Sequence, residues 1–401
     1  MIGLGLTRFV PPGLRGRAIE LGLAARATAR RGRDAALALR LSRQERPAYR
    51  GRRVALIGLV RSRTGLGRAA DLLAHELTSE GAQVFKLDAA SVVGREANIE
   101  RGDVGALADL PGLAVDDVVV NLNPPEFMRV LRAVGPEGLR GRSITGYWVW
   151  ELDRVPRSWG RALACAGRVW VPRRFVREAM LAAFPEAGAK IDVLPHRTDL
   201  DLFEQPGPGE REQARAGLGF EADQFVVLTS FSMLSSMARK NPLGAVQAFR
   251  SAFPPGTTRA RLVVRCLDGA AYPAGMAQIR AAAGGDVGIV EEAGHDTSIE
   301  AYYDAADAYL SFHRGEGVGL NLAEALGLGL PVVATGWSLT DEIVRHPLMH
   351  AVPSTLVPVA DPQRVYARPP PGARWAKPDE AAAARLLRLV AERWGRPASR
   401  S

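Results

Sequence analysis

Short apolar runs alternate with helix-like segments along most of the chain, and this alternation restricts the fold more than any other feature. A buried strand, a helix with apolar spacing and a second buried strand in succession predict a parallel α/β sheet. The first set has strands at 52–60, 83–88, 117–122, 168–172 and 190–194, with helices at 68–77 and 175–183. The second set has strands at 225–229, 261–266, 287–290, 308–311 and 331–335, with helices at 241–253, 298–306 and 320–328.

Two consecutive sets of this kind predict two doubly wound, Rossmann-like domains. The length of 401 residues agrees, because one ordinary core rarely grows so large. Ligands of such domains bind at the carboxyl ends of the strands, so we expect these ends to face one another across a cleft. The expected parts are a basic, partly helical arm at 1–50, an N-terminal domain at 51–197, a C-terminal domain at 198–378, and a final helix and tail at 379–401.

Two irregular regions separate these parts. The stretch 196–211 is rich in turn residues, and we place the interdomain connection there. The stretch 353–378 holds seven prolines and has no periodicity, which favours a loop or an extended wrap. Pro378-Asp379-Glu380 then starts a helix that runs through Arg393, with proline and acidic residues in its first turn.

The positive charge is concentrated in the arm. The net charge is +9, yet residues 1–53 hold 13 arginines and three acidic residues, so the remainder is close to neutral. This distribution disfavours nucleic acid as a partner of the domains. If 14–43 is helical, five of its arginines fall on one face, although Ile19 and Leu37 lie among them and glycines weaken the helix. We therefore expect residues 1–50 to bind an anionic membrane surface, with a solvated tail as the alternative.

The cellular compartment expected for the protein follows from its cysteines and its hydropathy. Cys165 and Cys266 are far apart in sequence, so neither a disulfide framework nor a zinc site is expected, and both are interpreted as small buried residues. No run of 18 apolar residues occurs, and the first twelve residues lack the pattern of a secretory signal. We expect a cytoplasmic protein that is peripheral on the inner face of the membrane.

A glycine-rich turn carries the strongest chemical signal. In residues 312–325 a strand ends, a turn containing Glu316, Gly317 and Gly319 follows, and a helix containing Glu324 begins. Unsatisfied N–H groups and the helix dipole favour an anion such as a diphosphate at such a helix start. Glu316 could accept hydrogen bonds from sugar hydroxyls, and Glu324 could reach a ribose. The alternative is that Glu316 only complements the dipole and Glu324 lies on the helix surface.

This segment closely resembles family 4 glycosyltransferases, which are retaining enzymes of the GT-B fold. They share a glutamate, the Gly-x-Gly-Leu turn and a second glutamate eight positions after the first, here Glu316 and Glu324. The resemblance covers roughly 52–393. It includes the glycine loop 65–67, the segment 239–249 and the Gly-x-Pro-Val-x-Ala strand at 329–334, while 146–152 and 169–172 resemble a bacterial subgroup used in surface-polysaccharide assembly.

The resemblance implies a role for each matching residue. Glu316 would contact the donor sugar, Glu324 the ribose, and Arg239 and Lys240 the diphosphate of a nucleotide-diphosphate sugar. A fixed cation such as Lys240 stabilises the charge of the departing diphosphate; a solvated helix start is the alternative for this pair. The full set expected to bind the donor is Gly65, Leu66, Gly67, Arg239, Lys240, Glu316, Gly317, Val318, Gly319, Leu320 and Glu324.

Three features depart from the family pattern. Many relatives carry an arginine where this chain has Ser230-Phe231-Ser232, and Arg239 could substitute for it. Many also carry a histidine in the loop that here reads 121–126, so none is assigned. Asn123 of that loop and Glu151 are the candidates on the side of the acceptor, a saccharide or a lipid-linked molecule; a buried, paired carboxylate is the alternative for Glu151. The chain also ends soon after Trp394, where relatives continue.

No metal or cofactor is expected. Asp199 and Asp201 form the only Asp-x-Asp pair, and we interpret them as structural because the two cations and the helix start already provide for the diphosphate. The family resemblance implies retention of the anomeric configuration by front-face attack. No second carboxylate is placed for a glycosidase-like displacement.

Three other functions compete with glycosyl transfer as interpretations of the sequence. Residues 65–70 satisfy the dinucleotide pattern G-x-G-x-x-A, and Asp88 lies near the spacing of a ribose-binding acid. Residues 61–64 separate this motif from its strand, however, which disfavours a dehydrogenase. A sugar-nucleotide epimerase of the same fold remains an alternative. A non-catalytic membrane-associated scaffold is also an alternative, although both glutamates and the basic pair argue against it.

Overall fold

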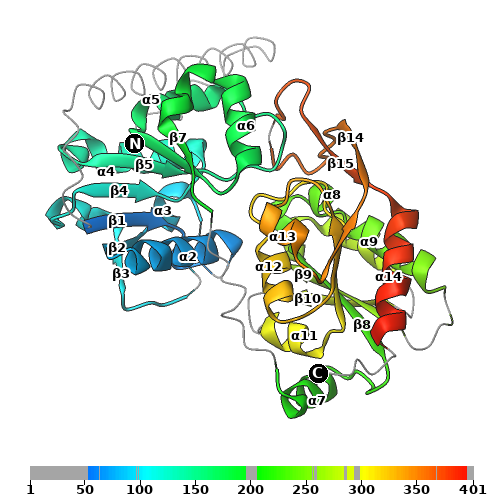
Figure 1. Cartoon of the computed structure of the whole chain (residues 1–401). Coiled ribbons are helices and arrows are strands. Elements are labelled where there is room, and N and C mark those ends of the chain that lie inside the picture. The colour runs from blue at the N-terminus through cyan, green and yellow to red at the C-terminus, as the bar shows by residue number, and fades with distance from the viewer. Residues whose placement is uncertain are drawn as a thin grey trace, which may run out of the picture. The chain divides into compact units, whose positions relative to one another are not determined.

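The structure is a computed structural model of the chain (Figure 1). It describes residues 53–62, 64–95, 97, 99–195, 206–254, 256, 260–283, 287–292, 299–366 and 368–394. The basic arm at 1–50 and the pair Asp199 and Asp201 lie outside this described part, so the expectations for them stay predictions. In the described part, no helix has the length and apolar character needed to cross a membrane.

Strands form two sheets and one ribbon. The order in the seven-stranded sheet is β3-β2-β1-β4-β5-β6-β7, and the order in the six-stranded sheet is β10-β9-β8-β11-β12-β13. The ribbon pairs β14 with β15. The strands are β1 (Arg53–Gly58), β2 (Gln83–Asp88), β3 (Val104–Ala106), β4 (Asp117–Val120), β5 (Ser143–Tyr147), β6 (Arg168–Val171), β7 (Ile191–Val193), β8 (Phe225–Ser232), β9 (Ala260–Leu267), β10 (Val287–Glu292), β11 (Ala308–Ser311), β12 (Val332–Thr335), β13 (Met349–Val352), β14 (Ser354–Pro358) and β15 (Arg374–Pro378).

Helices connect the parallel strands, as the alternation predicts. The longer ones are α2 (Gly65–Ser79), α4 (Pro124–Leu139), α6 (Arg174–Ala183), α7 (Pro208–Gly217), α9 (Pro242–Ala252), α10 (Pro273–Ala282), α12 (Leu320–Gly327) and α14 (Glu380–Trp394). The shorter ones are α3 (Ala90–Val93), α5 (Gly160–Cys165), α8 (Met237–Lys240), α11 (Ile299–Ala305) and α13 (Asp341–Arg345). Both cysteines are buried, and neither forms a disulfide.

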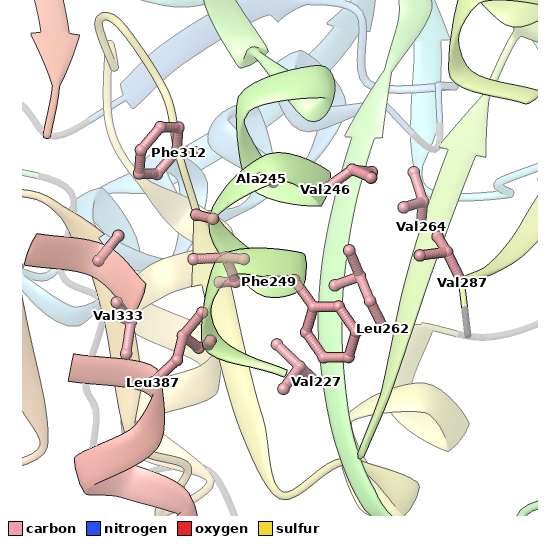
Figure 2. Packing of buried hydrophobic residues seen from close by; sticks show 14 of the residues in the cluster. Val227, Ala245, Val246, Phe249, Leu262, Val264, Val287, Phe312, Val333 and Leu387 are labelled. Atoms are coloured by element: carbon pink, nitrogen blue, oxygen red, sulfur yellow. The ribbon is translucent and has the colours of Figure 1, made fainter. Parts of the chain in front are cut away.

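Helices cover both faces of the six-stranded sheet. Side chains alternate along β8, so Val227 packs with Phe249 of α9 and Leu387 of α14 on one face (Figure 2). The neighbouring Val226 packs on the other face, against a cluster that contains Tyr302 of α11. Each pair of neighbouring strands in this sheet is parallel. Because both faces are covered, its strands are continuous apolar runs, and this is the doubly wound arrangement that the sequence predicts.

The chain divides into two compact units. Of the described residues, the first unit holds 53–62, 77–147 and 158–169, and the second holds 64–76, 148–157 and 170–394. The second unit therefore contains the whole six-stranded sheet together with two segments, 64–76 and 148–157, that come from earlier in the chain. Each unit is described by itself below.

The structure differs from the sequence prediction in two proline-containing stretches. The stretch 353–378 is not only a loop, because β14 and β15 pair in antiparallel register within it. Pro358 and Pro378 stand at strand ends, where a two-stranded ribbon tolerates a missing N–H. The expected loop at 121–126 is cut short at Pro124, where α4 begins. Proline suits the first helical position because its missing N–H would have no helical partner there.

Candidate functional site

The site lies where the order of strands reverses in the second unit's sheet. Strands β8 and β11 are neighbours, and the chain leaves them toward opposite edges of the sheet. Residues 233–241 follow β8, and the glycine-rich turn 312–319 follows β11. The carboxyl ends of two such strands form the usual ligand crevice of a doubly wound sheet. The topology thus brings Arg239 and Lys240 close to Glu316, although more than 70 residues separate them in sequence.

Glu316 is a buried carboxylate held by two cations. Its side chain is 9% exposed, and Lys240 Nζ donates a hydrogen bond to its Oε1. Arg239 Nη1 lies 3.5 Å from the same oxygen and donates at 2.8 Å to the carbonyl of Gly315. The backbone N–H of Glu316 donates to Ser338 Oγ at 2.8 Å. The carboxylate is therefore fixed from both its backbone and its side chain.

Opposing effects set the charges of this cluster. Burial on its own would raise the pKa of Glu316, but Lys240 and Arg239 lower that pKa to about 2. Burial lowers the pKa of Lys240, and the charge of Glu316 works against that change. Arg239 stays charged, because the acidic groups around it raise its pKa further despite burial. The cluster is therefore an ion-pair network at neutral pH, and the interpretation of Arg239 and Lys240 as a solvated helix start is wrong.

Glu324 is also buried, so the interpretation as a surface residue of α12 is wrong. Its residue is 5% exposed, and Tyr303 Oη donates to its Oε2 at 3.0 Å. Arg68 Nε lies 2.7 Å from Oε1; both residues belong to the second unit. Burial raises the pKa of Glu324, while Arg68 and the Tyr303 hydroxyl lower it. Burial together with the charge of Glu324 raises the pKa of Tyr303, so the phenol keeps its proton as the donor.

Two glycines of the turn are needed for different reasons. Gly319 precedes α12 with φ at +80°, a left-handed conformation that side chains rarely adopt. A Cβ at Gly317 would come within 2.4 Å of Val149 Cγ1, so the segment 148–151 fills the space that glycine leaves. Val318 and Leu320 flank Gly319.

No described side chain caps the start of α12, so its first N–H groups keep the anion-binding character expected of them.

Glu151 belongs to the same cluster of the second unit. Its Oε1 lies 3.9 Å from Arg239 Nη2, and Tyr366 Oη donates to its Oε2 at 3.4 Å. Asn123 lies in the first unit, directly before α4. Gly65, Leu66 and Gly67 form the first turn of α2, which begins at Gly65 rather than after the glycines.

His313 holds the start of the glycine-rich turn 312–319 through hydrogen bonds of its ring. Its ring is fully buried, with Nδ1 2.9 Å from Ser311 Oγ and Nε2 3.4 Å from the carbonyl of Trp337. Burial lowers the pKa of His313 to about 4, so the ring is neutral at physiological pH. A neutral ring donates from Nε2 to Trp337 and accepts the Ser311 hydroxyl at Nδ1. It is a structural support directly beside Glu316.

Sequence reasoning missed several partners of these residues. Tyr303, Ser338 and Tyr366 each hold a predicted residue through a hydroxyl, and Arg68 binds Glu324. No motif marks them, because they come from separate elements and meet only through the fold. Within the described ranges, no group of three or more His, Cys, Asp or Glu side chains is arranged to hold a metal ion.

The sequence of the second unit was found to be similar to a known protein family. Residues 230–368 match the family model of glycosyl transferases group 1. No curated protein matches the chain at a significant level. The matched residues 230–368 include Arg239, Lys240, Glu316 and Glu324.

Three solved structures show the same fold. A glycosyltransferase from Rickettsia africae ESF-5 is 14% identical, with a TM-score of 0.60 over 86% of this chain and 90% of its own. Sucrose-phosphate synthase from Thermosynechococcus elongatus is 17% identical, with a TM-score of 0.56 over 86% and 94%. The E. coli trehalose-6-phosphate protein bound with UDP-2-fluoro glucose is 12% identical, with a TM-score of 0.52 over 86% and 93%. The chain therefore has the GT-B fold, and its residues 230–368 are similar to the model of the group 1 glycosyl transferases.

Proposed function

We propose that the protein transfers a sugar from a nucleotide-diphosphate donor to a saccharide or lipid-linked acceptor, with retention of the anomeric configuration. The observation that carries this proposal is the buried Glu316–Lys240–Arg239 cluster at the start of α12. It combines two cations for a diphosphate with a carboxylate that can accept sugar hydroxyls. A structural neighbour of this fold is bound with UDP-2-fluoro glucose, which supports a donor of this class.

Each residue has a part in the proposed reaction. Lys240 and Arg239 bind the diphosphate and stabilise the charge that grows on it as its bond to the anomeric carbon breaks. Glu316 accepts hydrogen bonds from the donor sugar, and Glu324 accepts them from the ribose. The acceptor oxygen attacks the anomeric carbon from the face that the diphosphate leaves, and its proton passes to the leaving phosphate oxygen. Gly65, Leu66 and Gly67 complete the donor contacts, with Asn123 and Glu151 on the acceptor side.

The reaction is expected to proceed with retention and without a divalent metal, because fixed cations supply the charge that a metal would otherwise supply. A panel of UDP-, GDP- and other nucleotide sugars identifies the donor, and NMR of the product establishes the linkage. An inverted product would contradict the stereochemical part. Activity that EDTA abolishes and magnesium or manganese restores would contradict the metal part.

Replacing Tyr303 by Phe is expected to weaken binding of the nucleotide about 10-fold or more. A hydrogen bond to a charged group contributes about 1.5–3 kcal/mol, and Tyr303 Oη donates one to Glu324. Calorimetric titration with the nucleoside diphosphate of the donor and with its 3′-deoxy form measures the effect. Tyr303→Phe should discriminate less between the two ligands than the wild type does, which a merely structural role would not produce.

Tyr302→Phe is the matched control, because Tyr302 is the preceding buried tyrosine of α11 and packs with Arg265. It should leave the discrimination between the two nucleotides unchanged. Equal loss of discrimination in both variants would argue against a specific role for Tyr303.

We propose further that residues 1–50 attach the enzyme to an anionic membrane surface, where a lipid-linked acceptor of surface-polysaccharide type would be found. The 13 arginines of 1–53 support this attachment, since each basic residue near such a surface contributes about 1 kcal/mol. Liposomes containing phosphatidylglycerol should sediment the full chain at low salt. They should release it at high salt and fail to bind a variant that lacks 1–50. Equal sedimentation of both proteins would contradict the proposal.

A further inference from the structure

A cavity of about 360 Å³ lies in the second unit, where Met237 and Ala238 of α8 form part of its wall. Its walls come from the α8–α9 turn, the start of α10, and the proline-rich segment that contains β14 and β15. Met237, Leu243 and Val357 make the lining apolar, and Tyr272 and Trp375 contribute aromatic rings. This volume and this mixture are typical of sites for small organic molecules.

Arg314 is the one charged residue among those that line the cavity. Its guanidinium lies 5.7 Å from the centre of the Trp375 ring, and no described residue accepts a hydrogen bond from it. Burial lowers the pKa of Arg314, with the charge of Glu380 working against that change. No described carboxylate lies within hydrogen-bond distance of this half-buried cation, and Glu380 acts on it only from farther away. Beside apolar walls, such a cation favours a ligand that brings one negative charge.

We propose that this cavity binds a small organic monoanion with an apolar or aromatic body, and that binding there regulates the donor site. A single cation suits one carboxylate, sulfonate or phosphate-ester charge better than the multiple charges of a nucleoside diphosphate. The aromatic and aliphatic walls suit the body of such a molecule. The regulatory part rests on the proposed function, whereas the binding part does not.

Covalent continuity links the cavity to the donor residues. Met237 and Asn241 line the cavity and flank Arg239 and Lys240 on the same single turn. Arg314 precedes Glu316 by two residues, and its backbone N–H donates to the carbonyl of Arg239 at 2.7 Å. A ligand that shifts either wall therefore acts on backbone that is continuous with, or hydrogen-bonded to, the residues that hold Glu316.

The proline-rich segment ties the far wall to the same turn. Gln363 accepts a hydrogen bond from the backbone N–H of Met237 at 2.9 Å, and Ser236 donates to Asp361 at 2.8 Å. Ala376, beside Trp375 on β15, donates its N–H to the carbonyl of Arg314 at 2.8 Å. All three links join the cavity walls to the two segments that carry the ion-pair cluster.

The test uses 8-anilinonaphthalene-1-sulfonate, an aromatic monoanion whose fluorescence rises in apolar surroundings. Full-length wild-type protein should bind it in the presence of saturating UDP and GDP. Arg314→Gln should weaken that binding more than about 10-fold, the equivalent of losing one charge-assisted hydrogen bond. Ala360→Trp, which fills the cavity from an exposed position, should weaken it as well. Arg345→Gln is the matched control, because its side chain is 81% exposed and does not line the cavity.

Unchanged binding in a folded Ala360→Trp variant would overturn the site. Complete, competitive displacement of the probe by UDP or GDP would overturn it as well, whereas a limited change in probe affinity at saturating nucleotide is the reciprocal of the expected coupling. Thermal melting of each variant separates lost binding from lost folding. Bound probe should change the affinity for the nucleotide about five-fold or more. An unchanged affinity would overturn the regulatory part alone. A protein that binds the probe through Arg314 but transfers no sugar from any donor would count against the proposed function and leave the binding site standing.

Discussion

Glu316→Gln is expected to lower sugar transfer between about 10-fold and 1000-fold while the chain stays folded. Gln keeps the size of the side chain but removes the charge that Lys240 and Arg239 surround. Lys240 then loses the carboxylate that orients it, and the donor sugar loses its strongest acceptor. Glu324→Ala is expected to cause a loss of similar size by removing the proposed contact with the ribose.

Initial rates at saturating and at low donor concentration measure these losses. A loss in the first variant that persists at saturating donor would show that Glu316 acts in the transition state as well as in binding. Glu392→Gln is the control, because Glu392 is exposed on α14. Near-normal turnover of both Glu316→Gln and Glu324→Ala would show that the donor site has been placed wrongly.

Asp307→Ala is expected to destabilise the second unit by about 3–5 kcal/mol, because it leaves a buried arginine without its partner. The Asp307 side chain is 0% exposed and binds both Arg211 and Arg215 of α7. Its Oδ2 also accepts the backbone N–H of Val226 at 2.7 Å. This one carboxylate therefore joins α7 to β8, and Arg215 has a side chain only 7% exposed.

Thermal unfolding should shift by about 6–20 °C, from the usual proportion for a unit of this size. Asp341→Ala is the matched control: Asp341 pairs with Arg345 in an exposed i,i+4 contact, which contributes about 0.5 kcal/mol at most. Equal midpoints for the two variants would mean that the network around Asp307 contributes no more than a surface ion pair.

Much of the two sheets could be predicted from the sequence, because strands such as β1, β4, β8 and β12 are continuous apolar runs. The strands β3, β5 and β13 were not expected. The expected strand at 308–311 and β11 coincide. The helix expected from 378 to 393 begins two residues before α14 and ends one residue before it. Errors occurred where proline was interpreted as a breaker. Pro124 instead starts α4, and Pro358 ends a strand of the ribbon. Proline excludes an N–H donor, and these positions do not need one.

The candidate site was predictable only where its residues share a local motif. Glu316 and Glu324 lie on one turn and one helix, so their spacing could be read along the chain. Tyr303 and Ser338 reach them from other elements, and a hydroxyl donor at a distant position leaves no pattern in a single sequence. Glu151 was proposed, but its contact with Arg239 depends on the segment 148–157 belonging to the second unit.

The position of α14 in the core bears on how the protein is synthesised. Leu387 and Val390 of this last helix are buried with Val227 of β8 and Phe249 of α9, which the ribosome makes more than 130 residues earlier. One face of the six-stranded sheet is therefore covered only in part, by α9 and α10, until α14 emerges. During that interval the nascent chain exposes an apolar surface, the state in which chaperones bind and aggregation begins. A stop codon just before residue 380 would make that transient state permanent.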